Sequence, residues 1–444
     1  MSSSSSPPAL RLSLRSFWAV LPREGKWLLS TTAIQLLGRG LTLPFTVIYL
    51  HEVRGISLDV AGTLMAWIFV VGVLATGPGG AATDRFGARA VSLFGSSCQL
   101  VGVAILAVAH TVPQAAAAMT LMGVSGITWP AFNALVASIV QGSIRQTYFG
   151  ISFALVNLGI GVGGIIAGAF VDVHRPSTFT TIYLLDAASM LIPIGLLLGP
   201  LRHIHGRAER PDDTDGQPAS YWRIARQPSV AWLLLLTFIA TFVGYGQMEA
   251  GFPAFARQVS GASTRAIGWA FAANTAVIVL CQFVVLRRIE GHRRTRVLVV
   301  MAVVWATAWL TLGATGLAPA TMAATAGVIL FHAFFGFGET MLQPTVPAIT
   351  NDLAPDHLRG RYNALSAAAF QGGGIVGPVV AGVMLDHHLG SAFITMLLVG
   401  CGVVAVLAMA LERRISPVVN GIRPSSPSTY AKGAERAHDD RAAH

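Results

Sequence analysis

Apolar runs of about 20 residues recur along this chain, and they limit its possible folds more than any other feature. A helix of about 20 residues crosses a hydrocarbon core about 30 Å thick. Only 11% of the residues are charged, against roughly 25% in a soluble domain, so the runs predict membrane-spanning helices. We place twelve of them, at 28–50, 58–78, 90–110, 114–138, 148–170, 180–199, 230–254, 266–287, 296–316, 320–348, 362–385 and 391–411.

The order of these runs predicts an all-α polytopic membrane protein with two sets of six helices. A polar stretch separates the sixth run from the seventh and is typical of a surface linker. After the last run the composition changes to Ser, Pro, Arg and His, which cannot bury a core, so we expect disorder there. The predicted parts are a cytoplasmic N-terminal tail (1–27), a six-helix half (28–201), a cytoplasmic linker (202–228), a second six-helix half (229–411) and a disordered cytoplasmic tail (412–444).

The net charge of +10 is explained by where the basic residues lie rather than by a nucleic-acid partner. If the N-terminus is inside, 25 of the 30 Lys and Arg fall in the tails and in loops on the cytoplasmic side. Four fall on the outer side, and Arg39 alone lies in the interior of a span rather than at its end. This distribution follows the positive-inside rule. We therefore expect both termini in the cytoplasm, a location in the cytoplasmic membrane and no nucleic-acid binding.

The two predicted halves resemble each other in sequence. The segment from Trp129 matches the segment from Gln343 without gaps, at a constant offset of 214 residues. The register pairs unlike residue types that chance does not align together: Pro130 with Pro344, Arg145 with Arg359, Tyr148 with Tyr362, and Asp172 with Asp386. We infer a duplicated six-helix unit, with a binding site where the two repeats meet near the middle of the membrane.

A motif between the second and third runs carries a family resemblance. It reads GGAATDRFGARA, with the order G-x-x-x-D-R-x-G-x-R formed by Gly80, Asp84, Arg85, Gly87 and Arg89. This resembles the signature of the major facilitator superfamily. The resemblance covers residues 28 to 411 and implies the twelve-helix fold of that family. It also implies that Asp84, Arg85 and Arg89 form a cytoplasmic gate that holds the halves together in the outward-facing state.

The corresponding loop of the second half departs from the motif. It reads RRIEGHRR, in which Gly291 matches Gly87 but Arg288 stands in place of Asp84. A second gate of the same kind is therefore degraded.

Glycine elements in the fifth and eleventh runs are candidate hinges or close-packing sites. The eleventh contains GGGIVGPVVAG, similar to an element that antiporters of the family carry in their fifth helix. Glycines at such spacing also let helices approach closely in lipid. The residues concerned are Gly163, Gly164, Gly377, Pro378 and Gly382. The arginine that family antiporters usually have in the fourth helix is absent, since Met119 or Met122 occupies its position.

Ionisable residues inside the predicted spans are the candidate coupling and cavity charges. Such residues are costly in a membrane and point to function. Four lie on the first, seventh and tenth helices, which line the central cavity in the family: Arg39, Glu249, His332 and Glu339. Asp186 lies toward the outer end of a peripheral helix, where we expect a water-exposed group.

Arg39 needs an acidic partner, because an arginine does not lose its proton. Glu339 or Glu249 could supply it. We favour Glu339 as the partner and as the proton-coupling carboxylate, because it matches Arg39 in depth and Glu249 is near the outer end of its span. A static ion pair clamping the halves is the alternative for Arg39, and a hydrogen-bonded packing role is the alternative for His332.

The function predicted from these features is proton-coupled export of small amphipathic molecules, similar to the drug:proton antiporter branch. The expected partners are the substrate, protons and the lipid bilayer, in a monomer whose only energy source is the proton gradient. Uptake symport or facilitated diffusion of a nutrient uses the same fold and would need denser hydrogen-bonding groups in the cavity. A lipid-modifying enzyme is a distant alternative, since HExxH and GxSxG are absent. Cys98, Cys281 and Cys401 are isolated, so we expect no metal or disulfide.

Overall fold

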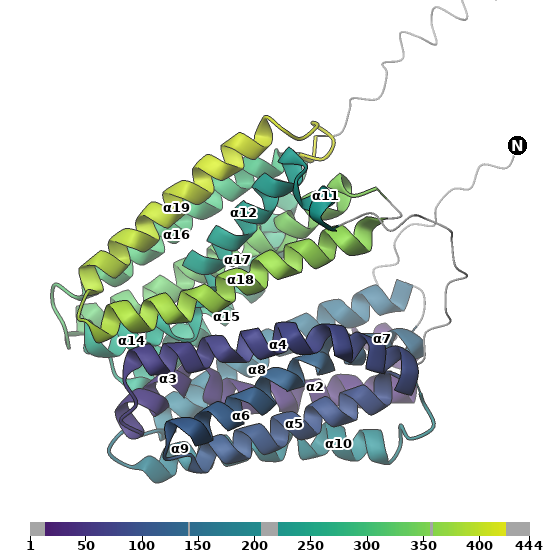
Figure 1. Cartoon of the computed structure of the whole chain (residues 1–444), viewed down its shortest axis with the longest axis horizontal. Coiled ribbons are helices and arrows are strands. Elements are labelled where there is room, and N and C mark those ends of the chain that lie inside the picture. Colours follow the sequence, from purple (N-terminus) through teal and green to yellow (C-terminus); the bar gives the residue numbers. More distant parts are fainter. Residues whose placement is uncertain (1–13, 141–142, 206–220, 356–357, 423–444) are drawn as a thin grey trace, which may run out of the picture.

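The chain folds into two helical bundles that meet at one end and diverge at the other (Figure 1). The computed structural model describes residues 14–140, 143–205, 221–355 and 358–422. Within these ranges the regular structure is helical. We call the side on which α2 begins and α19 ends the terminal side, and the opposite side the far side.

Residues of the first bundle form six spans, three of which are interrupted. The elements are α1 (Leu14–Val20), α2 (Arg23–Thr42), η1 (Leu43–Phe45), α3 (Thr46–Ile48), η2 (Tyr49–Val53), α4 (Leu58–Phe86), α5 (Ala88–Val108), α6 (Val112–Val124), η3 (Ser125–Ile127), α7 (Thr128–Ile139), α8 (Ser143–Phe170), α9 (Pro176–Ser189) and α10 (Leu191–Leu198).

The second bundle repeats this plan after a short helix, α11 (Tyr221–Ala225). Its elements are α12 (Pro228–Val243), α13 (Tyr245–Met248), α14 (Gly251–Gln258), α15 (Thr264–Ile289), α16 (Arg294–Thr315), α17 (Met322–Leu353), α18 (Arg359–Asp386) and α19 (Gly390–Glu412). Eleven helices within the described ranges are long and apolar enough to span a membrane, and α8, apolar over Ala154–Phe170, completes the twelve that the sequence predicts.

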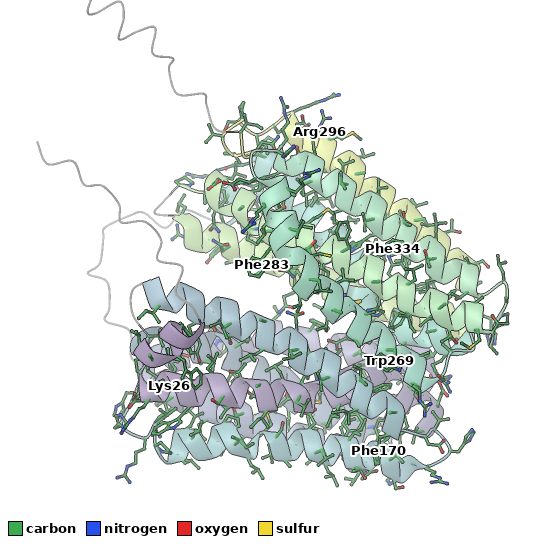
Figure 2. All side chains as sticks on the ribbon, turned by 180° about the vertical axis from the view of Figure 1, so that it is seen from behind. Lys26, Phe170, Trp269, Phe283, Arg296 and Phe334 are labelled. Atoms are coloured by element: carbon green, nitrogen blue, oxygen red, sulfur yellow. The ribbon has the colours of Figure 1, made fainter. Side chains whose placement is uncertain are left out.

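The outer faces of the bundles carry large apolar side chains, as lipid contact requires. Phe170, Trp269 and Phe283 are exposed to 49%, 49% and 75% (Figure 2). In water such a surface would be unfavourable, whereas in hydrocarbon it meets a solvent of its own polarity.

Two pairs of helices join the halves, and the internal repeat relates one pair to the other. Helix α4 packs against α18, and α8 packs against α15. These are spans two and eleven, and spans five and eight, so exchanging the halves converts one pair into the other. The duplication read from the sequence is therefore also present in the packing.

Glycines let the backbones of these pairs come into contact near the far side. A Cβ on Gly382 would overlap the carbonyl oxygen of Leu58, and a Cβ on Gly168 would lie 2.9 Å from the carbonyl oxygen of Thr264. Gly168 and Gly382 are 214 residues apart, the offset of the repeat. An equivalent glycine in each half therefore makes close backbone contact with the other half.

Polar contacts close the far side of the molecule. Arg257 binds Glu52 through both carboxylate oxygens, at 2.7 and 2.5 Å. The backbone N–H of Leu58 donates to Oδ1 of Asp386 across the halves at 2.9 Å. The halves are therefore joined at the far side and separate toward the terminal side, where their ribbons diverge (Figure 1).

The first and seventh spans, which are equivalent in the repeat, are both broken. Helix α2 ends at Thr42, where a 3-10 turn that contains Pro44 follows. The seventh span is interrupted at Gly244 and again at Ala250, between α12, α13 and α14. A Cβ on Gly244 would overlap the indole ring of Trp305, so the close contact at the first interruption needs a glycine. The buried amide of Gln247 donates to the carbonyl oxygen of Phe242 at 2.9 Å and so satisfies backbone that the break leaves unpaired.

The predicted tails are partly structured. Helix α1 lies within the predicted N-terminal tail and buries Phe17, and α2 begins at Arg23, earlier than the predicted span. At the other end Asn420 is buried and exchanges hydrogen bonds with Thr295 of α16. Residues 413–422 therefore pack on the second half, against the prediction of disorder, and residues 423–444 lie outside the described ranges.

Candidate functional site

Two cavities lie between the far-side contacts and the terminal side, one in each half. The first half contains a cavity of about 490 Å³ and the second half one of about 480 Å³. Trp129 of α7 lines both, so the two cavities adjoin. Tyr245, Gln343 and Phe370 contribute to the wall in the second half. A space of this size accommodates a drug-sized molecule.

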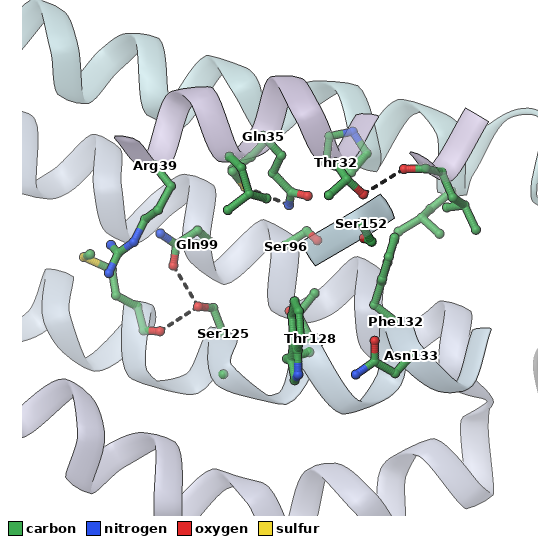
Figure 3. A pocket seen from close by; sticks show the side chains of 18 of the residues that line it. Thr32, Gln35, Arg39, Ser96, Gln99, Ser125, Thr128, Phe132, Asn133 and Ser152 are labelled. Atoms are coloured by element: carbon green, nitrogen blue, oxygen red, sulfur yellow. Dashed lines mark hydrogen bonds between the residues drawn. The ribbon is translucent and has the colours of Figure 1, made fainter. Parts of the chain in front are cut away.

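The cavity of the first half has one charged end and an aromatic wall (Figure 3). Arg39 lies at one end and Phe132 and Asn133 at the other, and Arg39 is the one charged side chain among the described residues that line it. Most of its surface is apolar, but eight neutral side chains can form hydrogen bonds: Thr32, Gln35, Ser96, Gln99, Ser125, Thr128, Asn133 and Ser152. The cavity is therefore mainly apolar, with a single charge and several neutral hydrogen-bonding groups.

Arg39 forms an ion pair with Glu249 across the two halves. Nη2 of Arg39 lies 3.6 Å from Oε2 of Glu249, and each side chain is 28% exposed. This distance is too long for a hydrogen bond, so the pair is loose and reachable by water. The prediction that Glu339 is the partner of Arg39 is wrong in this conformation. Glu249 lies at the break in the seventh span, directly before Ala250.

Both members of this pair lie at helix ends. Arg39 stands in the last turn of α2, the end of a helix that carries a partial negative charge. Glu249 lies between α13 and α14, after the last residue of the one and before the first turn of the other.

Glu339 lies inside the second half rather than in the cavity wall. It is 8% exposed, and its Oε2 accepts a hydrogen bond of 2.6 Å from Nδ2 of Asn274. The hydroxyl of Tyr245 interacts with the same carboxylate and accepts a hydrogen bond of 2.6 Å from Gln343. Tyr245 and Gln343 line the second cavity, so Glu339 lies behind its wall, in contact with a lining residue.

His332 is enclosed by aromatic rings. It is fully buried, with ring centroids 4.2 Å from Phe252 and 4.5 Å from Phe271. Neither ring nitrogen has a hydrogen-bond partner within the described ranges. His332 therefore packs without hydrogen bonds and takes no part in the walls of either central cavity.

Asp186 is buried, which corrects the prediction of a water-exposed group. Its exposure is 0%, and its Oδ2 accepts a hydrogen bond of 2.7 Å from the hydroxyl of Thr42. Its other oxygen has no partner within the described ranges. Arg39 is close enough for the two charges to interact. This contact could not be predicted from local sequence, because Thr42 and Asp186 are 144 residues apart.

The motif between α4 and α5 forms the turn that its glycine predicts. Gly87 has φ +90°, and the matching Gly291 of the second half has φ +77°. Arg85 lies over the ring of Phe86, and Arg89 donates to the carbonyl oxygen of Leu197 at 2.6 Å within the same half. A Cβ on Gly80 would meet open space. The side chain of Asp84 lies outside the described residues, so its role in a gate stays a prediction.

The candidate hinge residues lie in close helix contacts. A Cβ on Gly163 would lie 2.5 Å from the carbonyl oxygen of Leu37, and one on Gly377 would lie 2.7 Å from Gly246 in the broken seventh span. Gly164 faces α15 at ordinary contact distance, and the carbonyl of Pro378 abuts Gly62 of α4. These glycines pack helices together, and hinge motion stays a prediction.

Several residues of the site gave no signal in the sequence. Gln99 and Ser125 are joined by a hydrogen bond of 2.7 Å in the cavity wall. Glu52 and Arg257 close the far side, although 205 residues separate them. Glu52 follows the first predicted span and Arg257 follows the seventh, and these spans are equivalent in the repeat. That equivalence is the one sequence feature that could have predicted their contact.

Comparison with known proteins assigns a family to this architecture. A family model described as Major Facilitator Superfamily matches residues 28–329 and 260–435. The chain is 25% identical to the uncharacterized MFS-type transporter YttB of Bacillus subtilis (strain 168), over 89% of this chain and 96% of that protein. It is 23% identical to the Na(+), Li(+), K(+)/H(+) antiporter of Planococcus maritimus, over 80% and 88%.

Two further matches agree with this. The chain is 23% identical to the multidrug resistance protein MdtH of Aeromonas hydrophila subsp. hydrophila, over 87% of this chain and 95% of that protein. Among solved structures, that of the nucleoside transporter NupG (D323A mutant) superposes with a TM-score of 0.72 at 13% identity, over 88% of this chain and 100% of that chain.

Proposed function

This chain belongs to the major facilitator superfamily, and from that premise we propose that it exports small amphipathic molecules in exchange for protons. It is a transporter rather than an enzyme, as the family and the names of its relatives indicate. The finer steps, proton coupling and export, depend on the site.

The observation that carries the proposal is the ion pair between Arg39 and Glu249. Each half contributes one charge, so opening the far side must break the pair. Breaking it leaves two charges unpaired in a partly dry cavity, which is unfavourable unless a proton or a substrate compensates. The pair therefore links the movement of the halves to the binding of a proton.

Two relatives support the choice of antiport and of amphipathic substrates. One is named as a cation/proton antiporter and another as a multidrug resistance protein. The mainly apolar cavity of about 490 Å³, with aromatic groups and hydrogen-bonding side chains, suits molecules that have both apolar and polar parts.

The charge distribution supports an orientation with the terminal side in the cytoplasm. Most Lys and Arg of the chain lie on that side, in line with the positive-inside rule. The cavities would then load from the cytoplasm, as an exporter requires. We further propose a monomer in the cytoplasmic membrane, driven by the proton gradient without a cofactor. A reporter fused after Leu411 should be active in the cytoplasm, and activity only outside would reverse the orientation.

The test uses purified protein in vesicles with an imposed proton gradient and a panel of amphipathic cations and nutrients. Substrate addition should drive protons in the direction opposite to the substrate. Glu249→Gln should abolish accumulation, because it removes one charge of the pair and keeps the shape. Glu412→Gln is the matched control, since Glu412 pairs with Arg296 within one half. Unchanged accumulation by Glu249→Gln would contradict the proposal.

Uptake symport is the second candidate, and the eight hydrogen-bonding side chains of the cavity favour it. Dense hydrogen bonding is what a hydrophilic nutrient needs. The same vesicles distinguish the two functions, because a symporter moves protons in the same direction as its substrate.

A further inference from the structure

We propose that Asp186 is the acid that exchanges the coupled proton, and that Arg39 switches its ion pair from Glu249 to Asp186 when an amphipathic cation binds beside Glu249. This rests on the proposed function and adds to it the proton site, the charge of the substrate and a stoichiometry.

Asp186 is buried with only one of its two carboxylate oxygens hydrogen-bonded. It is fully buried between α9 and α2, and the hydroxyl of Thr42 binds only its Oδ2. Oδ1 has no partner within the described ranges. Buried carboxylate oxygens are nearly always satisfied, so an unpaired one indicates an interaction that is made in another state.

Arg39 is placed to reach both acids. Arg39 and Thr42 are three residues apart on one face of α2, and Thr42 already touches Asp186. Gly38, beside them, lacks the Cβ that would overlap the hydroxyl of Ser189 and lie 3.1 Å from Oδ1 of Asp186. The glycine thus lets α9 approach the turn of α2 that carries the arginine.

The guanidinium of Arg39 is weakly held in this state. Its contact with Glu249 is 3.6 Å, longer than a hydrogen bond. An arginine has five N–H donors and prefers two parallel bonds to a carboxylate. A loose pair on one side and an unpaired carboxylate oxygen on the other allow exchange of partners at small cost.

Charge balance gives the number of protons. One arginine between two ionised carboxylates leaves a net negative charge in a mostly dry interior, which is costly unless one acid holds a proton. Here Arg39 pairs with Glu249, so the proton belongs on Asp186. When Arg39 moves to Asp186, the O–H bond of that acid breaks, its proton leaves to cavity water and the carboxylate pairs with the guanidinium.

Other ionisable groups around the two acids are few. Tyr183 on the same helix as Asp186 donates to the hydroxyl of Thr46 and stacks near Tyr49. Helix α5, which also packs on α9, carries Arg89, bound to Leu197 near the terminal side, and Cys98.

Two further groups lie on the side of Glu249, in the second half. They are Tyr245 and Glu339, which interact with each other and with Gln343 and Asn274. Arg39 is therefore the cation that the two acids share.

The cation replaces Arg39 at Glu249. The carboxylate of Glu249 is partly exposed and keeps its negative charge when Arg39 leaves. The cavity whose charged end is Arg39 also carries Trp129, Phe132 and Phe149 in its wall, and aromatic faces attract organic cations. One monovalent cation enters for each proton that leaves, so the charge of the site is conserved. Substrate and proton then compete, as antiport requires.

The experiment measures protons released when a lipophilic cation binds. Tetraphenylphosphonium is the probe, and tetraphenylborate is the control of the same shape and opposite charge. Protein in detergent, in weak buffer with a pH indicator, should release about one proton for each tetraphenylphosphonium bound. Infrared difference spectra of the same sample should lose a protonated carboxyl band. Tetraphenylborate should do neither.

Variants locate the proton. Asp186→Asn keeps the shape and an acceptor for Thr42 but gives Arg39 no second ionised partner. It should therefore bind the probe more weakly than wild type and release no proton on binding. Glu249→Gln should weaken binding of the probe at least tenfold, and Glu412→Gln should behave as wild type. A normal proton release by Asp186→Asn would overturn the assignment. If that variant does not fold, the absence of the infrared change in wild type would overturn it instead.

The outcomes separate this inference from the proposed function. Two results would contradict the exchange of Arg39 between Glu249 and Asp186 but leave proton-coupled export standing. They are export that is unaffected by Asp186→Asn, and tighter binding of tetraphenylborate than of tetraphenylphosphonium. Absence of substrate-dependent proton movement in vesicles would reject the exporter itself.

Discussion

Arg39 and Glu249 face each other from breaks in two spans that the internal repeat makes equivalent, with 3.6 Å between Nη2 and Oε2. Both breaks end a helix before it reaches the far side. The contact between the halves at the cavity is electrostatic, whereas the contacts nearer the far side combine close glycine packing with the ion pair between Arg257 and Glu52.

The ion pair between Arg257 and Glu52 should hold the far side closed. Arg257→Gln removes two short charged hydrogen bonds between side chains that are about one quarter exposed. We expect a cost of about 1 kcal/mol after allowance for solvent, which shifts the balance toward a far-side-open state about fivefold. Spin labels at Ser177 and Ser391, both exposed near the far side, should report a larger population of long distances. An unchanged distance distribution would mean that the pair does not contribute to closure.

Gly382 should be intolerant of a methyl group. A Cβ there would overlap the carbonyl oxygen of Leu58, so Gly382→Ala must push α4 and α18 apart. We expect a cost of about 1–3 kcal/mol, a lower melting temperature and slower transport. Gly402→Ala is the control, since a Cβ at Gly402 meets open space and alanine favours a helix. Equal melting temperatures for the two variants would show that α4 and α18 can separate freely.

Glu339→Gln tests whether Glu339 is the proton-coupling carboxylate, as the sequence predicts, or a buried hydrogen-bonding group, as the structure indicates. Its partners are the amide of Asn274 and the hydroxyl of Tyr245, and a glutamine can still accept from both. We expect proton-driven accumulation within about twofold of wild type. Glu339→Ala should be more harmful, because it leaves the buried amide of Asn274 unpaired at a cost of about 1–3 kcal/mol. Loss of accumulation by Glu339→Gln would restore Glu339 as the coupling carboxylate.

His332→Phe should keep or raise the thermal stability of the protein. The imidazole lies among Phe252, Phe271, Phe331 and Phe335, and its nitrogens lack partners within the described ranges. Replacing it by phenylalanine removes two unsatisfied polar atoms and keeps the aromatic contacts. His332→Ala, which leaves a cavity, should cost about 2–4 kcal/mol. A melting temperature of His332→Phe as low as that of His332→Ala would indicate a polar partner for the ring.

The sequence predicts the spans, because hydrophobicity is a local property that each run of about 20 residues carries by itself. The repeat can be found by aligning the two halves of the sequence, and the turn at Gly87 by its glycine. The structure confirms both. The ends of the first and seventh spans are not predictable in this way. The seventh is interrupted at Gly244, which packs closely against Trp305, and that contact joins residues 61 positions apart.

The same limit explains the errors at the site. Depth along a span indicated Glu339 as the partner of Arg39, but depth does not say which face of a helix points inward. For Asp186, the position toward the outer end of a peripheral helix predicts a water-exposed group, and that position does not show what packs against the side chain. Its burial depends on Gly38 and Thr42 of α2, and only the packing of α9 on that helix reveals it.

The equivalent glycines Gly168 and Gly382 have a consequence for assembly. Each half contacts the other through two helices, its second span and its fifth. The second span of one half packs against the fifth span of the other, so the two surfaces of a half are complementary. Such an interface is that of an isologous dimer. A six-helix half produced alone carries both complementary surfaces, so we expect it to associate with a copy of itself rather than remain a single bundle.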